Sequence, residues 1–261
     1  SSQDLYARAF VFDVDLSKTG GGALDFGLSL SSQTVAFNIN FGDGSDFDIT
    51  TYNDSNLTHT YSSTGIKTIT ITGTLPHPKF TGTYAQKLVN ISNWGSIGVT
   101  NMKDTFYNCV NLEVAATDGV GWKPTTMENA FRQCIIMTGG VSNIDTSNCT
   151  TFKRCFYSSI YNPVTGGNLF DEDLNNWNTS NVTDMYEMFF NGFFNSPIDQ
   201  WDTSNVTTMY RMFIQAPNFN QPIGVWDVSS VQNFDRTFKS TLSFNQSCLL
   251  YTSDAADDSL R

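Results

Sequence analysis

One sequence motif occurs three times between residues 177 and 238, and this repetition constrains the fold more than any other feature of the chain. The three copies read WNTSNVTDMYEMF, WDTSNVTTMYRMF and WDVSSVQNFDRTF. Two aromatic columns keep steps of 24 and 25 residues: Trp177, Trp201 and Trp226 at the start of the copies, and Phe189, Phe213 and Phe238 at their ends. A fixed period of this length indicates a repeat array, in which each unit packs mainly against its neighbours.

The array extends back to residue 102. A Met or Phe opens each of six repeats, and this column consists of Met102, Met127, Phe152, Met185, Met209 and Phe234. A Phe follows four residues later in every repeat, and its column consists of Phe106, Phe131, Phe156, Phe189, Phe213 and Phe238. Both columns step by 25, 25, 33, 24 and 25 residues. We place the insertion behind the longest step at residues 162–167, because extra residues in repeat arrays go into loops on one face.

Within a repeat, the apolar spacing predicts one short helix and one short strand. Val206, Met209 and Phe213 follow the i, i+3, i+7 spacing of one helix face. The stretch from Phe219 to Trp226 is too short for a second helix and predicts an extended segment. Such a unit is leucine-rich-repeat-like, and we expect its copies to stack as a solenoid.

The inward columns are the expected core of the repeats, because no single repeat can bury its own apolar face. These core positions are Trp177, Trp201, Trp226, Met185, Met209, Phe234, Phe189, Phe213 and Phe238. Cys109 and Cys134 occupy equivalent positions, and we interpret them as buried thiols, with a disulfide as the alternative in an exported protein. The glycosylation sequons at Asn178, Asn181 and Asn205 fall on the repeat pattern, so we interpret these asparagines as structural.

The first 75 residues predict a small β-sandwich, because short alternating apolar runs are separated by turn residues. Within them, FGDGS at 41–45 is followed by HTY at 59–61, ahead of the last strand. These segments resemble the PKD (polycystic kidney disease) domain family, which implies an immunoglobulin-like β-sandwich that serves as a spacer or interaction module in exported proteins. The residues that carry the resemblance are Gly42, Asp43, Gly44, His59 and Tyr61.

The turn at 42–44 has a structural interpretation. Asp43 can accept backbone hydrogen bonds inside the turn, and His59 is expected to bond to a nearby turn. Asp43, Asp46 and Asp48 leave a Ca²⁺ site as an alternative, although their spacing is not that of an EF-hand loop. No other cofactor or metal is expected.

The repeats resemble a bacterial surface-protein repeat. Residues 177–246 follow the pattern W-D-T/V-S-N-V-T-x-M-x-x-M-F and then F-N-Q-P-I-x-x-W almost continuously, and residues 88–134 match its leading part. The resemblance is to the BspA-type repeat, which is also found in mycoplasma lipoproteins. It implies a leucine-rich-repeat-like solenoid on exported or cell-surface proteins, acting in adhesion or protein–protein contact.

Residues 248–257 read CLLYTSDAAD and resemble a translated sequencing-library adapter. We therefore expect the chain to be a fragment that ends in a non-native, disordered tail. The expected fold is α+β and has four parts: a PKD-like sandwich at 1–75, a linker at 76–87, a six-repeat solenoid at 88–247 and the tail at 248–261.

Charge and motifs argue against several classes of function. A net charge of −11 disfavours a nucleic-acid groove and a polybasic membrane surface. No apolar run approaches the roughly 18 residues of a spanning helix, and no signal peptide is recognisable, so membrane contact would need an anchor outside this sequence. Hydrolase, metalloprotease and phosphate-loop motifs are missing, and we expect a protein that is not an enzyme.

We expect an extracellular or cell-surface protein that binds a protein or glycan on a host or neighbouring cell through the exposed face of its repeats. Candidate contact residues are Tyr186, Glu187, Tyr210 and Arg211, because aromatic and Arg side chains dominate binding hot spots. A phage or virion component, structural or receptor-binding, is one alternative. An accessory module of a secreted enzyme is the other.

Overall fold

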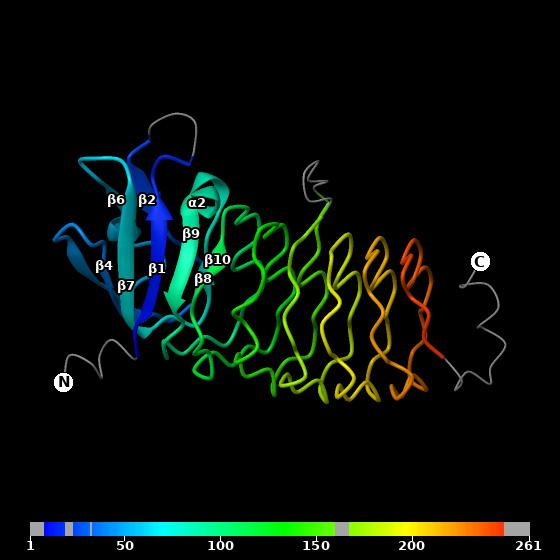
Figure 1. The fold of residues 1–261 in the computed structure, drawn as a ribbon. Helices are drawn as coiled ribbons and strands as arrows, with labels where there is room; N and C mark the ends of the chain where they lie inside the picture. Colours follow the sequence, from blue (N-terminus) through cyan, green and yellow to red (C-terminus); the bar gives the residue numbers. More distant parts are fainter. Residues whose placement is uncertain (1–7, 19–22, 32, 160–166, 248–261) are drawn as a thin grey trace.

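The computed structural model describes residues 8–18, 23–31, 33–159 and 167–247, and nearly all of its regular structure is β (Figure 1). The strands are β1 (Phe10–Asp15), β2 (Asp25–Gly27), β3 (Ser29–Leu30), β4 (Ala36–Asn40), β5 (Asp46–Ile49), β6 (Thr58–Thr60), β7 (Ile66–Thr74), β8 (Pro78–Lys79), β9 (Leu88–Asn93) and β10 (Glu113–Val114). The described elements also include one short 3-10 helix, η1 (Ser55–Leu57), and one α-helix, α2 (Gly82–Lys87).

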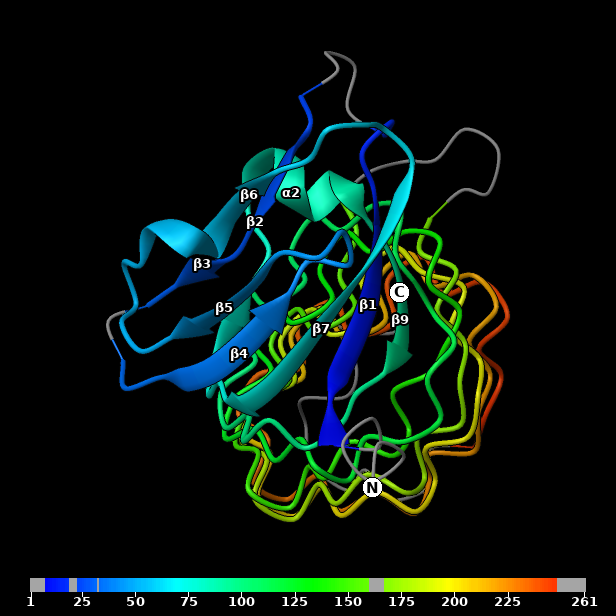
Figure 2. The same cartoon turned by 90° about the vertical axis from the view of Figure 1, so that its left-hand side faces the viewer.

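The largest sheet has six strands in the order β10-β9-β1-β7-β4-β5. Its neighbours pair antiparallel except β9 and β10, which run in parallel. Apolar and polar residues alternate along β1, as expected for a strand whose two faces differ in burial. Phe12 and Val14 are fully buried, whereas Asp13 and Asp15 are partly exposed. Two further pairs, β2–β6 and β3–β8, form separate two-stranded sheets beside the large one (Figure 2).

One hydrophobic core runs from the large sheet into the repeats. The Phe10 ring on β1 stacks at 6.2 Å from Trp94 and meets Trp122 edge-on at 5.1 Å. Phe80 stacks on Phe106 of the first repeat at 5.4 Å. The sheet therefore covers the aromatic side of the first repeat, which would lie open to water at the end of a bare array.

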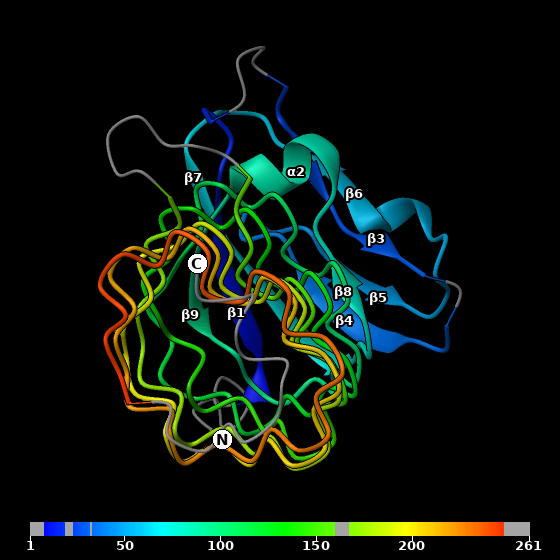
Figure 3. The same ribbon diagram turned by 90° about the vertical axis from the view of Figure 1, so that its right-hand side faces the viewer.

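The repeats follow the sheet as a row of irregular coils (Figure 1), which lie one behind another when viewed along the row (Figure 3). Alternate N–H groups bind the next coil: Met209 donates to the Asn233 carbonyl and Phe213 to the Thr237 carbonyl, each at 2.9 Å. The N–H groups between them turn back on their own coil, as Met212 does to the Met209 carbonyl at 3.0 Å. Each coil thus pairs with its neighbour while bending through successive four-residue turns.

The described residues of the repeats contain no helix, so the predicted α+β fold with one short helix per repeat is wrong. The reason is left-handed backbone at two positions in five of the six units and at Arg154 in the third, for example Arg211 with φ 53° and Gln215 with φ 56°. A left-handed residue every four positions ends each turn before a right-handed helix can propagate. Met209 and Phe213 still face the core, because two four-residue turns bring them to the same side as one helix would.

The predictions of an immunoglobulin-like sandwich and of a leucine-rich-repeat-like solenoid are wrong as well. The main sheet is a single six-stranded sheet that reaches into the first repeat through β9 and β10, and later coils share isolated parallel bridges such as Thr208 with Asn233. Residues 76–87, expected as a linker, contain β8 and α2. The insertion expected at 162–167, apart from Gly167, and the tail at 248–261 lie outside the described residues.

The predicted core columns lie inside the coils. Buried members are Trp177, Trp201, Trp226, Met185, Met209, Phe189 and Phe213, whereas Phe234 and Phe238 of the last repeat are half-buried. Trp201 Nε1 donates to the Leu174 carbonyl at 2.9 Å, and Trp226 Nε1 to the Ile198 carbonyl at 3.1 Å. These bonds satisfy buried polar groups between coils. The tryptophans therefore orient adjacent coils through hydrogen bonds and also bury a large apolar area.

Candidate interaction surface

The four predicted contact residues lie together on neighbouring coils. The rings of Tyr186 and Tyr210 stack 4.9 Å apart. The Arg211 guanidinium lies 4.8 Å over the Tyr210 ring and 3.5 Å from the Glu187 carboxylate. Glu187 is only 3% exposed, so it can hold arginines in place but offers little surface to a partner. The other three side chains remain partly exposed.

These residues belong to two columns, located one and two positions after the Met or Phe that opens each repeat, and a third column follows five positions after it. We call the three columns together the ladder face. The first column is Lys103, Glu128, Lys153, Tyr186, Tyr210 and Asp235; the second is Asp104, Asn129, Arg154, Glu187, Arg211 and Arg236; the third is Tyr107, Arg132, Tyr157, Phe190, Ile214 and Lys239. All members except Glu187 and Ile214 are partly or fully exposed.

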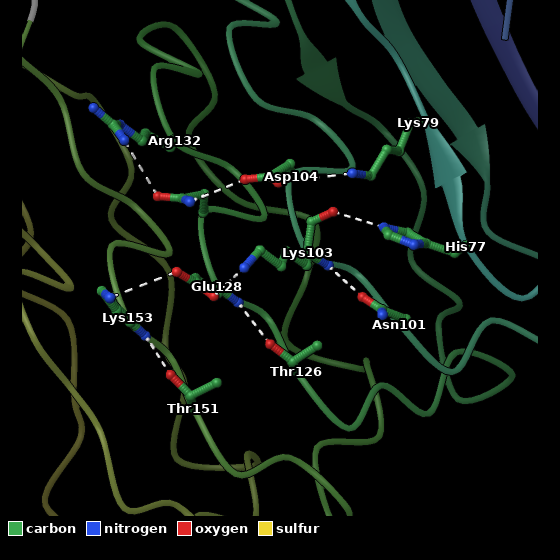
Figure 4. A network of polar contacts seen from close by, with 11 residues as sticks. His77, Lys79, Asn101, Lys103, Asp104, Thr126, Glu128, Arg132, Thr151 and Lys153 are labelled. Atoms are coloured by element: carbon green, nitrogen blue, oxygen red, sulfur yellow. Dashed lines mark hydrogen bonds and ion pairs between the residues drawn. The ribbon is translucent and has the colours of Figure 1, made fainter. Parts of the chain in front are cut away.

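The first column begins as a chain of alternating charges (Figure 4). Lys103 Nζ lies 2.7 Å from Glu128 Oε2, and Lys153 Nζ lies 3.6 Å from Glu128 Oε1. The hydrogen bond from Lys103 lowers the pKa of the Glu128 carboxyl, against the opposing effect of burial. The column then becomes aromatic, since Lys153 lies 5.7 Å over the ring of Tyr186, which stacks on Tyr210.

A small polar side chain fixes the backbone of each first-column residue from two positions earlier. Asn101 Oδ1 accepts the Lys103 N–H at 2.8 Å, and Thr126 Oγ1 accepts the Glu128 N–H at 3.2 Å (Figure 4). The same contact recurs in the later repeats at Thr151, Asp184, Thr208 and Asn233. Turns of this kind hold the chain where the first-column side chains emerge.

The second column is built entirely from residues with left-handed backbone. Their φ values are 57° for Asp104, 55° for Asn129, 54° for Arg154, 51° for Glu187, 53° for Arg211 and 56° for Arg236. Asn129 Nδ2 donates to Asp104 Oδ1 at 2.9 Å, and Arg154 Nε donates to Glu187 Oε2 at 2.7 Å. Glu187 therefore lies between Arg154 and Arg211 of the two adjacent coils, in charge-assisted contacts that restrict all three side chains.

The third column places Arg132 between two tyrosine rings. Its guanidinium carbon lies 5.1 Å from the Tyr107 ring centre and 4.8 Å from the Tyr157 ring centre. Arg132 Nη1 reaches Asn129 Oδ1 at a long 3.5 Å, and its buried Nε has no hydrogen-bond partner among the described residues. The sequence reasoning missed this cluster, although the repeat spacing marks the three residues as equivalent.

The ladder face is locally positive in an acidic chain. Its three columns hold seven Lys and Arg against four Asp and Glu, a local net charge of +3 in a chain whose net charge is −11. A negatively charged partner is attracted to this face and repelled by the remainder of the surface. Charge therefore favours contact here over contact elsewhere on the molecule.

The residues that resemble a PKD turn also come together, in the N-terminal part of the chain. Asp43 Oδ2 lies 2.7 Å from His59 Nε2, and this hydrogen bond lowers the pKa of Asp43 to about 2. Tyr61 Oη donates to the Phe41 carbonyl at 3.0 Å. Gly42 and Gly44 have φ values of 80° and 98°, which favour glycine.

The aspartates considered for Ca²⁺ have protein partners, and the Ca²⁺ alternative stays a prediction. Asp43 bonds to His59, while Asp46 and Asp48 both accept from the Asn38 side chain. Across the described ranges, no group of three or more His, Cys, Asp or Glu side chains could hold a metal ion.

The cysteines and the sequon asparagines have contacts inside the repeats. Cys109 and Cys134 are buried free thiols, and burial raises the pKa of both. Asn178 Oδ1 accepts from Ser180 Oγ at 2.7 Å. The Asn181 and Asn205 amides each donate to a main-chain carbonyl of a preceding repeat at 2.8 Å.

A small cavity lies away from the ladder face. It measures about 240 Å³. Its lining residues are Val114, Ala115, Ala116, Thr117, Asp118, Gly140, Ser142, Asn143 and Glu172. None of these belongs to the three columns of the ladder face. In the part of the chain that the structure describes, no helix has the length and apolar character needed to span a bilayer.

Comparison with known proteins agrees with the repeat pattern. Residues 78–162 and 158–259 match the family described as "Mycoplasma protein of unknown function, DUF285". No curated protein and no solved structure matches the chain. The second match extends into 248–259, where the adapter-like interpretation stays a prediction, as does the PKD-like resemblance. This uncharacterised family comprises mycoplasma and BspA-like surface proteins, so the predicted resemblance to the BspA-type repeat is confirmed. The family is not known as catalytic. Because the two matches cover well over half of its residues, the chain belongs to this DUF285 family.

Proposed function

We propose that this chain is a non-catalytic surface protein that binds a partner protein through the ladder face. The observation that supports the proposal is the stacked pair Tyr186 and Tyr210, partly exposed and bordered by Arg211. Tyr and Arg are enriched at protein-binding hot spots, where they combine a large apolar area with hydrogen-bond donors.

The ladder face is also preorganised for binding. Arg154 and Arg211 are both held by Glu187, and Lys103 and Lys153 are both held by Glu128. Side chains that are already restricted lose less conformational entropy when a partner orders them. A repeat array that fixes its surface side chains in this way can bind without rearranging.

A protein partner fits this surface better than a small glycan. Sites for small molecules are concave and enclose most of the ligand. The cavity of about 240 Å³ has none of the ladder face residues in its lining. A glycan partner is therefore treated as an outcome of the experiment.

The proposal is tested by measuring binding of the fluorescently labelled chain to cultured animal cells and to bacterial cells, before and after surface trypsin treatment. We expect saturable, trypsin-sensitive binding that Tyr210→Ala weakens at least about tenfold, as for a hot-spot residue. Tyr52→Ala is the matched control, because Tyr52 is 44% exposed and lies outside the ladder face. Binding that resists trypsin but is lost after periodate oxidation would indicate a glycan, and equal binding by both variants would refute the proposal.

A further inference from the structure

Arg132 differs from the other arginines of the ladder face because it has no carboxylate partner among the described residues. Lys103, Lys153, Arg154 and Arg211 each lie within 3.6 Å of a glutamate oxygen. Arg132 instead contacts rings, at 5.1 and 4.8 Å on its two sides. The described fold therefore holds Arg132 between two rings without a carboxylate beside it.

The burial of Nε determines which part of Arg132 stays available. A guanidinium is planar and carries five N–H donors in its plane. The rings of Tyr107 and Tyr157 lie on its two sides, and Nε is buried without a hydrogen-bond partner among the described residues. The terminal Nη1 and Nη2 groups are therefore the ones that a ligand can reach, and the described partner there is Asn129, at 3.5 Å from Nη1.

This arrangement suits a carboxylate. A carboxylate accepts two parallel N–H bonds from a guanidinium edge, and such bidentate pairs are stronger than neutral hydrogen bonds. Rings on both sides of the guanidinium displace water from it and so strengthen its attraction to an anion. The positive charge of the ladder face, +3 in a chain of −11, favours the same kind of ligand.

We propose that the Arg132 guanidinium is the anchor for a carboxylate of the partner, supplied by an acidic segment of a protein. The proposal rests on the proposed function, because Arg132 belongs to the same ladder face. Lys103 and Lys153 are 46% and 35% exposed on the neighbouring coils. An acidic segment lying along the row of coils would meet a cation on each side of Arg132.

The experiment uses the whole chain and a fluorescein-labelled hexaglutamate peptide, with binding followed by fluorescence anisotropy at low ionic strength. We expect saturable binding that Arg132→Gln weakens at least about tenfold, the effect of losing one strong charge-assisted pair. Arg132→Lys is expected to weaken binding too, because an ammonium keeps the charge but lacks the planar fork. Lys239→Gln is the matched control, since Lys239 lies in the same column and has no stacked ring or carboxylate partner among the described residues.

Arginine side-chain NMR separates a local role from a structural one. The Nε–Hε signal that disappears in Arg132→Lys should shift saturably with the peptide, while the signals of Arg154 and Arg211, both engaged by Glu187, should move less. Unchanged circular dichroism of Arg132→Gln would show that the fold survives the substitution. If Arg132→Gln unfolds the chain, the NMR titration of the unmodified protein still decides the question.

Several outcomes would overturn the inference. They are no hexaglutamate binding by the unmodified chain, equal weakening by Arg132→Gln and Lys239→Gln, and stronger binding of polygalacturonate than of hexaglutamate. The last result would assign the carboxylate to a glycan. If Tyr210→Ala abolishes cell binding while Arg132→Gln does not, this inference fails and the proposed function stands. If hexaglutamate binding depends on Arg132 while Tyr210→Ala leaves cell binding intact, the proposed function fails instead.

Discussion

Replacing Glu187 by Gln should destabilise the protein more than any other single loss of charge on the ladder face. Glu187 is 3% exposed and lies between two guanidinium groups, with Arg154 Nε at 2.7 Å and Arg211 Nη1 at 3.5 Å. Glutamine has the same shape and keeps one acceptor oxygen, so Glu187→Gln removes the charge with little change in packing. Its amide nitrogen then faces one of the two arginines with a donor where an acceptor is needed.

The magnitude follows from the exposure of the three groups. Removing one partner of a fully buried ion pair costs about 3–5 kcal/mol, because the remaining charge is left without compensation. Arg154 and Arg211 are 32% and 28% exposed, so water can reach part of each guanidinium once the carboxylate is gone. We therefore expect a loss of about 2 kcal/mol in the free energy of unfolding, below the range for full burial.

Glu128→Gln is the matched control, since Glu128 also lies between two cations. Lys103 and Lys153 are 46% and 35% exposed, and exposed pairs of this kind contribute about 0–1 kcal/mol. Urea denaturation followed by circular dichroism gives the free energy of unfolding of each variant, and equal m-values show that the two can be compared directly. If Glu187→Gln unfolds at the same urea concentration as the unmodified protein, or no earlier than Glu128→Gln, the buried charge does not stabilise the coils and the reasoning is refuted.

Three further substitutions test the repeats and the N-terminal turn. Hydrogen bonds from the hydroxyl and the N–H of Ser204 lower the pKa of Asp202, so its contribution to the free energy of unfolding exists above about pH 4 and is lost as pH falls through the lowered pKa. Asp202→Asn should therefore make the stability less sensitive to acid in that window, and an unchanged profile of stability against pH would contradict this. Trp201→Phe should cost about 1–3 kcal/mol in urea denaturation, because the 2.9 Å indole bond to the Leu174 carbonyl is lost and a cavity is left, while the Trp177 N–H still donates to that carbonyl. A loss below about 0.5 kcal/mol would count against it. Gly42→Ala should lower the melting temperature more than Gly44→Ala, since both have positive φ but only at Gly42 would a Cβ collide with the Thr68 carbonyl.

The repeat spacing predicted which side chains face inward, but not the backbone that turns them there. Met209 and Phe213 are buried, as are Met212 and Ala216 between and after them. These four positions follow i, i+3, i+4, i+7, which is also the pattern of an amphipathic helix. Two four-residue turns produce the same pattern, so hydrophobic periodicity alone could not distinguish a helix from the observed coil.

The sequence predicted only part of the ladder face. Tyr186, Tyr210 and Arg211 were proposed as contact residues because aromatic and Arg side chains dominate binding hot spots, and their role in binding stays a prediction. Arg132 was missed because its tyrosine neighbours come from the repeats before and after it, at 5.1 and 4.8 Å. A contact between equivalent positions of adjacent repeats is visible in sequence only when the columns are compared across the whole array.

The left-handed positions of the second column explain why the fold and the proposed binding surface share residues. Left-handed backbone is unfavourable by about 1–2 kcal/mol for residues other than glycine, yet this column holds Arg154, Glu187 and Arg211 with φ between 51° and 54°. Glycine would relieve the backbone but remove the ion pairs that join adjacent coils. Charged side chains at these strained positions fit a column with two roles. The column joins adjacent coils through ion pairs, and it fixes the spacing of Tyr186 and Tyr210 in the first column. A change that shifts one coil should therefore alter binding at its neighbours, even where it touches no partner residue.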